Sequence, residues 1–391
     1  MIVRQFIQWL RTAPAGERAD ATSALARAYL YSDLSPDDRA AAEGAMLMLL
    51  DDPSPLVRRA LAEVFAASQA APPAVVHALA GDQPEIAGPI LERSPLLVDA
   101  DLVDRIATGS AEIQTAIASR EHLPRAVAAA IAEVGTAEAC LVLIENANVE
   151  VAAFSLDRIV ERHGHLAAIR EALLQRADLP AATRQALVVK LSATLAEFVA
   201  ARAWLEDDRA RRVAKEACER ATVTLAAQVA RSEVRPLIRH LCASGQLTAG
   251  LVLRALLCGN IRLFEEALAE LSGLPLARVS AIVHDRGGGS FRALYGKARL
   301  PASLYPAFRE VVEAIQASGF VGDIGGAERL KRRMIERVLT RCAEAQLGDI
   351  DPLMTLLRRF ATEAAREEAR LFCDEIAGEA GIELEAQRAA A

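Results

Sequence analysis

The sequence predicts an all-α protein in which a solenoid of short helix pairs is followed by a second helical domain and a C-terminal helical hairpin. Hydrophobic residues make up 52% of the 391 residues, but aromatic residues make up only 4%. Alanine, leucine and valine must therefore supply the buried surface, which favours close-packed helices over a sheet. A repeating apolar pattern and regularly spaced proline, glycine and capping residues support the same interpretation.

The N-terminal part begins with two helical segments, residues 17–30 and 36–50. Pro36 follows Ser35 and takes the first-turn position that proline favours in helices. Residues 52–58, Asp-Pro-Ser-Pro-Leu-Val-Arg, then open a further helix. Their spacing of aspartate and Val-Arg resembles the start of the second helix in HEAT-type repeats.

Apolar residues then recur at an offset of 27 and next of 26 residues. They are Ile86 and Ile90, Ile113 and Ile117, and Ala139 and Leu143. Partner helices are expected at 99–107 and 123–133. One helix pair cannot bury its apolar face alone, so such pairs stack into a curved solenoid with a concave inner surface. We therefore expect HEAT-like repeats over residues 1–190.

Two arginines, Arg93 and Arg120, recur at the same 27-residue offset. Two interpretations are open at this point. The side chains either form salt bridges from repeat to repeat or are ordinary surface charges.

A second helical domain is expected over residues 191–318. It starts with two longer helices, around 191–205 and 208–230, because turn residues are missing there. Shorter helices follow. Thr248 is suited to cap one of them, Gly259 to end it and Gly273 to end the next.

The C-terminal part, residues 319–391, is expected to form a flexible joint and a helical hairpin. The joint is the glycine-rich stretch 319–326. The apolar stripes of the two long helices are Leu330, Met334, Val338 and Cys342, and Leu353, Leu357, Phe360, Ala364 and Leu371. This hairpin either docks on the body of the chain or forms a homodimer through residues 327–380.

The main candidate site is a glycine loop amid positive charge. Ten Lys or Arg residues and five Asp or Glu residues lie between Arg231 and Leu300, whereas the whole chain has a formal net charge of −7. This local excess indicates an anion or an acidic partner. The candidate residues are Arg286, Gly287, Gly288, Gly289, Ser290, Arg292, Lys297 and Arg299.

Glycines let the backbone approach a ligand, and Ser290 is expected to start a helix whose free amides favour negative charge. Arg292 and Arg299 are seven residues apart and would share a face of that helix. The loop lacks the Gly-Lys-Ser/Thr sequence of a Walker phosphate loop. A plain hinge is therefore an alternative, as are arginines that merely balance Glu265 and Glu266.

No complete catalytic or metal-binding constellation is recognisable. His163 and His165 offer two imidazoles, but a structural metal site normally needs four ligands and no others lie nearby in the sequence. No serine lies in a Gly-x-Ser-x-Gly elbow. The six cysteines are widely spaced without a Cys-x-x-Cys pair, so we expect reduced thiols in a cytosolic protein. We expect no cofactor, no metal and no catalytic residue.

Several short phrases of the sequence resemble a known bacterial family. They are LCASGQLT (241–248), LRAL (253–256), FEEALA (264–269), FRALY (291–295) and LYPAF (304–308). Together they are similar to the family catalogued as domain of unknown function 2336, and the preceding repeats fit it as well. The resemblance covers most of residues 30–316. It implies the helical fold and brings no activity, cofactor or catalytic residue with it.

The sequence therefore favours a cytoplasmic, non-enzymatic scaffold or regulatory adaptor that binds another protein through the inner surface of repeats 50–190. A sensor of a small phosphorylated, nucleotide-like ligand at residues 286–299 is the first alternative, and a HEAT-like nucleic-acid binder is the second. The acidic chain with only two tryptophans argues against nucleic acid. No apolar run is long enough to cross a bilayer.

Overall fold

A computed structural model of the chain describes residue 9 and residues 12–285, 289–318, 331–344 and 351–389. These residues form helices and turns and contain no strand, so the all-α prediction is confirmed. The chain divides into two compact units, Met1–Leu179 (unit 1) and Pro180–Ala391 (unit 2). The predicted joint at 319–326 lies outside the described residues.

Unit 1 consists of short helices. They are α2 (Ala15–Tyr31), α3 (Pro36–Leu49), α4 (Pro55–Phe65), α5 (Pro73–Leu79), α6 (Pro84–Arg93), α7 (Asp99–Thr108), α8 (Ala111–Ala118), α9 (Arg125–Val134), α10 (Ala137–Glu145), α11 (Ala153–His163) and α12 (Ala167–Gln175). Ser35 caps α3 as expected, because its Oγ accepts a hydrogen bond from the backbone N–H of Asp38.

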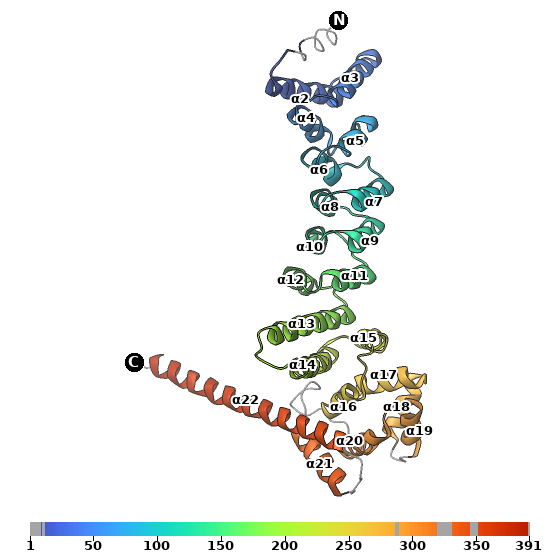
Figure 1. Cartoon of the computed structure of the whole chain (residues 1–391), viewed down its shortest axis with the longest axis vertical. Coiled ribbons are helices and arrows are strands. Elements are labelled where there is room, and N and C mark those ends of the chain that lie inside the picture. The colour runs from blue at the N-terminus through green and yellow to red at the C-terminus, as the bar shows by residue number, and fades with distance from the viewer. Residues whose placement is uncertain (1–8, 10–11, 286–288, 319–330, 345–350, 390–391) are drawn as a thin grey trace. The chain divides into compact units, whose positions relative to one another are not determined.

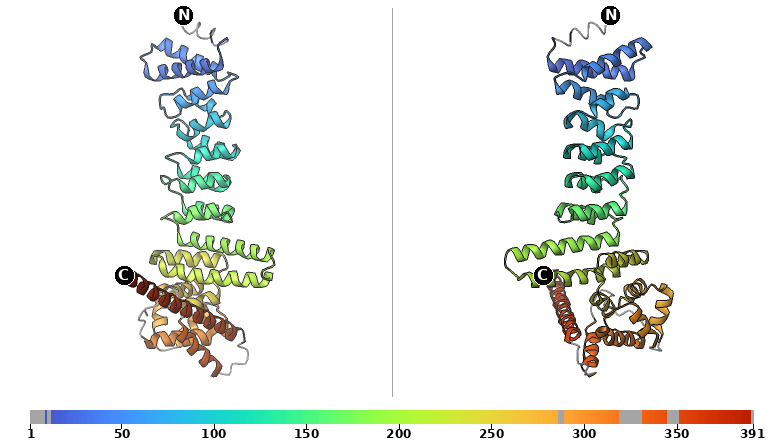
Figure 2. Two further views of the ribbon diagram at one scale, coloured as in Figure 1. Left: turned by 90° about the vertical axis from the view of Figure 1, so that its left-hand side faces the viewer. Right: turned by 45° about the vertical axis from the view of Figure 1, so that its right-hand side comes forward.

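The helices of unit 1 alternate between two columns. Helices α4, α6, α8, α10 and α12 stack in one column, and α5, α7, α9 and α11 stack in the other (Figure 1). Figure 2 shows the same arrangement from two further directions. The recurring apolar residues, Ile86 to Leu143, are buried along this stack. The predicted stacking of short helix pairs is thus confirmed.

Charged pairs link the first repeats of unit 1. The guanidinium of Arg18 donates two hydrogen bonds, of 2.9 and 2.8 Å, to the carboxylate of Asp52. Arg58 donates in the same way to Asp82, at 2.6 and 3.2 Å, and also to the backbone carbonyl of Asp52, at 2.6 Å. These part-buried pairs fix consecutive turns between helices to one another.

Further along unit 1, polar side chains bond to backbone carbonyls instead. The last four carbonyls of any helix lack partners within that helix. Arg120, after α8, donates to Leu91 O at 2.6 Å and to Ser94 O at 2.7 Å at the end of α6. Asn146, after α10, donates to the carbonyls of Ala118 and Arg120 at the end of α8, at 3.1 and 2.7 Å. We call this series the carbonyl ladder.

The carbonyl ladder continues with Arg176, after α12, which donates to Ile144 O at the end of α10 at 3.0 Å. The carbonyl ladder also shows what the two recurring arginines, Arg93 and Arg120, do. Arg93 is exposed, whereas Arg120 is half-buried and joins two repeats through carbonyl groups rather than through a carboxylate. Burial lowers the pKa of Arg120 from its ordinary value.

Unit 2 begins with two long helices and continues with shorter ones. Its helices are α13 (Ala181–Ala201), α14 (Asp207–Gln228), α15 (Arg231–Ala243), α16 (Ala249–Leu257), α17 (Ile261–Ser272), α18 (Leu276–His284), α19 (Gly289–Lys297), the 3-10 turn η1 (Ala302–Leu304), α20 (Tyr305–Ser318), α21 (Arg332–Glu344) and α22 (Asp351–Ala389). The predicted caps occur, since Thr248 Oγ1 accepts from the N–H of Leu251, and Gly259 and Gly273 have positive φ angles of 78° and 67°.

The C-terminal hairpin, α21 and α22, is part of the core of unit 2. Val338 and Cys342 on α21 are buried, as are Leu353, Leu357 and Phe360 on α22. The body of the chain therefore covers these apolar stripes, which corresponds to the docking alternative. Within the described residues, no helix has the length and apolar character that a bilayer crossing requires.

We predict that Arg120→Met lowers the free energy of unfolding by about 1–3 kcal/mol, because two carbonyls at the end of α6 lose their donors. Urea denaturation followed by circular dichroism measures the change. Arg93→Met is the matched control, since Arg93 is exposed, and it should change stability by less than about 0.5 kcal/mol. Equal effects of the two substitutions would refute the role of the ladder.

Candidate functional site

The predicted anion site lies at the start of α19, and the structure describes it in part. Residues Arg286, Gly287 and Gly288 lie outside the described residues. Helix α19 begins at Gly289, so Ser290 is already helical rather than the residue before the helix. Both Gly289 and Ser290 are exposed.

Aromatic packing fixes α19 in unit 2. The ring of Phe291 lies 6.4 Å from that of Phe264, and the ring of Tyr295 lies 5.1 Å from that of Tyr305. The hydroxyl of Tyr295 donates a 2.7 Å hydrogen bond to Pro301 O. Phe291, Leu294 and Tyr295 are all buried. This face of the segment 291–295 therefore has a packing role.

The structure describes three of the basic candidates, on α19 and just beyond its end. Arg292, Lys297 and Arg299 are exposed. The guanidinium carbon of Arg292 lies 5.8 Å from the ring centroid of Tyr305. Arg299 lies beyond the end of α19 with φ at 55°, so the expectation that it shares a helix face with Arg292 is wrong.

The other predicted groups have local structural partners. Glu265 is bonded to the hydroxyl of Ser280 and lies 3.0 Å from Nε2 of His284, so the described arginines of α19 do not balance it. His163 Nε2 lies 3.4 Å from Gly135 O, and burial lowers the pKa of His163. Among the described residues, no group of three His, Cys, Asp or Glu side chains is arranged to hold a metal ion.

Two buried cysteines have strongly raised pKa values. Burial raises the pKa of Cys140 to about 11 and that of Cys258 to about 12. A thiol becomes a nucleophile only as its thiolate. These two cysteines therefore stay protonated at neutral pH and behave as core residues.

A projecting hairpin of α13 and α14 carries a group of exposed apolar side chains. Between residues 188 and 213 only Ala210 is buried, so little core lies beneath this part of the two helices. Its large exposed residues are Leu191, Leu195, Phe198, Trp204 and Val213, which we call the hairpin tip. Leu191, Leu195 and Phe198 follow at four and three residues and so share one face of α13.

The turn of this hairpin is held in a fixed conformation. The guanidinium of Arg202 lies 4.0 Å from the ring centroid of Phe198 and 5.4 Å from that of Trp204. The two rings contact edge to face at 5.9 Å. Ala203 between them has φ at 54°, a left-handed conformation that costs a non-glycine residue roughly 1–2 kcal/mol. Packing around the turn maintains this strain and keeps Trp204 exposed.

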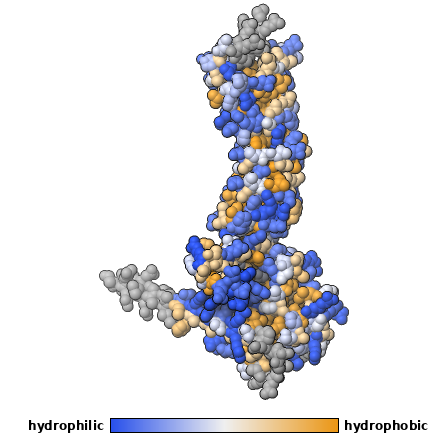
Figure 3. Space-filling view, viewed as in Figure 1, coloured by the Kyte–Doolittle hydropathy of each residue, from blue (hydrophilic) through white to orange (hydrophobic). Residues whose placement is uncertain are grey.

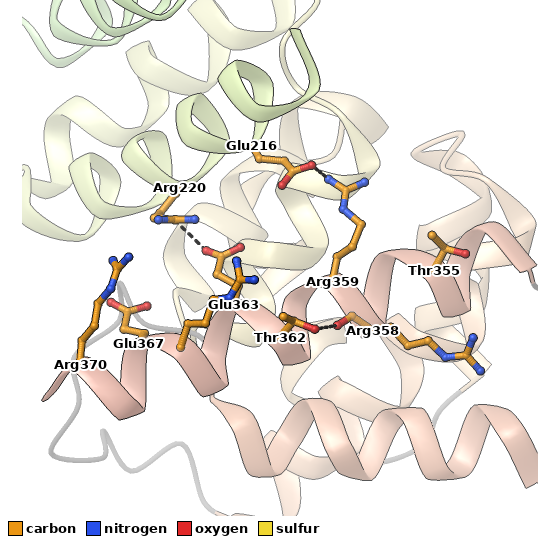
Figure 4. Close-up of a pocket in the computed structure, with 10 residues that line it drawn as sticks. Glu216, Arg220, Thr355, Arg358, Arg359, Thr362, Glu363, Glu367 and Arg370 are labelled. Atoms are coloured by element: carbon orange, nitrogen blue, oxygen red, sulfur yellow. Dashed lines mark hydrogen bonds and ion pairs between the residues drawn. The ribbon is translucent and has the colours of Figure 1, made fainter. Parts of the chain in front are cut away.

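An arginine-rich hollow lies between α14 and α22, with a volume of about 520 Å³ (Figure 4). Its lining residues are Glu216, Arg220, Thr355, Arg358, Arg359, Thr362, Glu363, Arg366, Glu367 and Arg370. Figure 3 shows a dense hydrophilic surface over the same part of unit 2. We call it the arginine hollow.

A buried ion pair forms the floor of the arginine hollow. Arg254 on α16 is fully buried and donates two hydrogen bonds, of 2.6 and 2.9 Å, to the carboxylate of Glu363. Its guanidinium also stacks on the ring of Phe360 at 4.6 Å. Arg220 on α14 donates to the same carboxylate at 2.8 Å. This pair joins α14, α16 and α22.

The two carboxylates near this pair have opposite pKa shifts. Burial opposes the ionisation of Glu363, but the hydrogen bonds and charges of Arg254 and Arg220 outweigh burial and hold its pKa below the ordinary value. For Glu219 burial dominates and raises the pKa, although Arg254 and Lys215 act in the opposite direction. Of these two carboxylates, Glu363 is therefore the one that ionises more readily and pairs with Arg254.

Sequence reasoning missed both surfaces. Arg254 was counted within the basic window, yet the structure buries it against Glu363, 109 residues away in the chain. The four-residue spacing of Arg366 and Arg370, with Arg358 on the same i, i+4 row, would have indicated a basic row along α22. The four- and three-residue spacing from Leu191 to Phe198 was a similar signal. Neither pattern reveals that α14 lies opposite the arginines.

We predict that Glu363→Leu lowers the free energy of unfolding by about 3–5 kcal/mol at neutral pH, because Arg254 stays buried without a partner. Arg254→Met combined with Glu363→Leu should restore most of that loss, since both charges are then removed. Glu368→Leu is the control. It breaks only the exposed pair with Arg332, whose loss costs at most about 1 kcal/mol.

The loss should also depend on pH. The lowered pKa of Glu363 contributes stability that is complete above the unfolded pKa, near 4.3, and is lost as pH falls through the folded pKa. The difference in free energy of unfolding between wild type and Glu363→Leu should therefore become smaller below about pH 4. A gap that stays constant down to pH 2 would contradict the ionised pair.

Comparison with known proteins identifies one family. The family described as "uncharacterised protein conserved in bacteria (DUF2336)" matches residues 86–348, more than half of the chain. The match runs from α6 through the whole of α21 and ends before α22. Neither the curated proteins nor the solved structures give a match. The family resemblance seen in the sequence is confirmed, and the chain belongs to the bacterial DUF2336 family.

Proposed function

We propose that the chain is a non-enzymatic adaptor that binds another protein through the hairpin tip. The observation that supports this most is the group of five large apolar side chains exposed on a projection with almost no core beneath it. Trp204 is 63% exposed and Phe198 is 44% exposed. Large apolar side chains exposed together on one hairpin mark candidate sites of interaction.

The composition of the hairpin tip fits a protein interface. Tryptophan and arginine are the residues that most often dominate binding energy at such interfaces. Trp204, Phe198 and Arg202 already contact one another in the unbound protein. A surface that is already ordered loses less conformational entropy on binding, which favours affinity.

The residues next to the hairpin tip indicate the chemistry of the partner. Arg209 and Arg212 are exposed on α14, and neither has an ion pair with a described residue. A partner segment with an apolar face and flanking acidic residues would satisfy both features. An amphipathic helix with acidic edges is the simplest structure of that kind.

The inner surface of the repeats is the other place where a partner could bind. In unit 1 the exposed apolar residues are spread over several helices, as with Leu56 on α4, Phe154 on α11 and Leu174 on α12. They do not follow one another on one helix face as the residues of α13 do. The hairpin tip is therefore the preferred surface.

We predict that Leu195→Glu combined with Phe198→Glu abolishes capture of a partner by the full-length protein. The charges would have to be buried without a partner on binding, so affinity should fall at least about tenfold. Capture from bacterial lysate, followed by mass spectrometry, identifies candidates. Binding of each purified candidate to wild type and variant is then measured by calorimetry.

Phe154→Glu combined with Leu174→Glu in unit 1 is the matched control, since it adds the same charges to exposed apolar positions elsewhere. It should bind the partner like wild type. Loss of binding in this control alone would assign the partner to the repeats and refute the hairpin tip. Equal binding by all three proteins would also refute it, and so would binding of the hairpin tip to protein-free anionic lipid vesicles.

A further inference from the structure

We propose that the arginine hollow binds a small ligand that carries two or more linked phosphate groups. The hollow is separate from the hairpin tip and from the predicted site on α19. Five of its ten lining residues are arginines and three are glutamates. The inference depends on which of these arginines are already paired.

Two arginines of the hollow belong to its framework. Arg220 donates to Glu363, and Arg359 pairs with Glu216 across the gap between α14 and α22. Figure 4 shows these pairs at the side of the hollow that faces α14. Because Arg254 also donates to Glu363, the acidic residues Glu216 and Glu363 are fully engaged. They leave little negative charge to neutralise the others.

The other three arginines have no ion pair with a described residue. Arg358, Arg366 and Arg370 are exposed, line the hollow and lie at spacings of eight and four residues, which puts them on one i, i+4 row that winds along α22. Thr362 lies between them on the same row, and its hydroxyl donates to Arg358 O, so it is not a donor to an anion in the hollow. Glu367 also lines the hollow, beside Arg370 (Figure 4), so the arginines still outnumber the glutamates by five to three.

Arg366 and Arg370 are one helical turn apart, so their like charges repel, and an anion between them removes that repulsion. The planar guanidinium group presents paired donors that match phosphate oxygens. Twelve residues of helix separate Arg358 from Arg370, which corresponds to roughly 18 Å along α22. A single phosphate cannot reach across that distance, whereas a chain of linked phosphates contacts two or three arginines at once.

The size and polarity of the hollow favour a small, highly charged ligand. Its volume of about 520 Å³ lies in the range of small-molecule sites. Its walls are formed by charged and hydroxyl side chains, without the aromatic platforms on which nucleic-acid bases stack. A ligand there would contact α22 and Arg220 on α14 together, and so would hold α22 against the body of unit 2.

The test is calorimetric titration of the full-length protein with inorganic tripolyphosphate at moderate salt. Wild type should bind tripolyphosphate at least about tenfold more tightly than it binds monophosphate, because one phosphate engages fewer guanidinium groups. Arg366→Gln combined with Arg370→Gln should weaken tripolyphosphate binding at least tenfold. Neither arginine has an ion pair with a described residue, so the melting temperature should stay unchanged.

Arg337→Gln combined with Arg341→Gln on α21 is the charge-matched control, with two exposed arginines that are also four residues apart. It should bind tripolyphosphate like wild type. Hydrogen exchange within residues 355–370 should also slow when tripolyphosphate binds, because the ligand bridges α14 and α22.

Three outcomes would overturn the proposal. One is the absence of tripolyphosphate binding by wild type. Another is an equal loss in the α21 control, which would mean that net charge rather than the hollow attracts the anion. The third is tighter binding of an acidic peptide, such as a short polyglutamate, than of tripolyphosphate. The hairpin-tip variant Leu195→Glu with Phe198→Glu should leave tripolyphosphate binding intact, so this test and that of the adaptor function can fail independently.

Discussion

Short helices impose one constraint on unit 1, namely that many backbone carbonyls need partners outside their own helix. A helix of eight to eleven residues leaves its last four carbonyls without internal donors, so a large share of its polar backbone must be satisfied by other means. Arg120, Asn146 and Arg176 supply donors from the following repeat. The same hydrogen bonds set the distance and rotation between repeats. The backbone carbonyls therefore gain their donors only when the repeats stack.

Unit 2 meets a different constraint, because it buries charge. Arg254 lies among leucines on α16 and is stable there only because Glu363 and Phe360 of α22 reach it. Buried ion pairs add little net stability, yet they strongly disfavour arrangements in which one partner is missing. The ion pair therefore fixes the position of α22 along its axis relative to α16. It also presents the opposite face of α22, with its unpaired arginines, toward solvent beside α14.

The parts of the fold that depend on local sequence were predictable. Thr248, Gly259 and Gly273 act within one or two turns of their own position, and they end or cap helices as expected. The isoleucines recur at the same interval as the repeats, so their burial could be predicted from the sequence. The partners of Arg120 and Arg254 depend on residues 26 to 109 positions away, so the chain alone identifies neither. Counting charges over residues 231–300 therefore overestimated the positive charge available to a ligand. Arg254 is neutralised by Glu363, and Arg239 pairs with Glu270.

The neighbour-only stacking of unit 1 also has a mechanical consequence. The main contacts of each described helix are with its partner and with the helices of the adjoining repeats. Tension applied along the columns is therefore borne in series by the interfaces between repeats, each sharing the extension through small rotations. By this argument unit 1 extends by small rotations at many interfaces, while every individual helix pair stays folded.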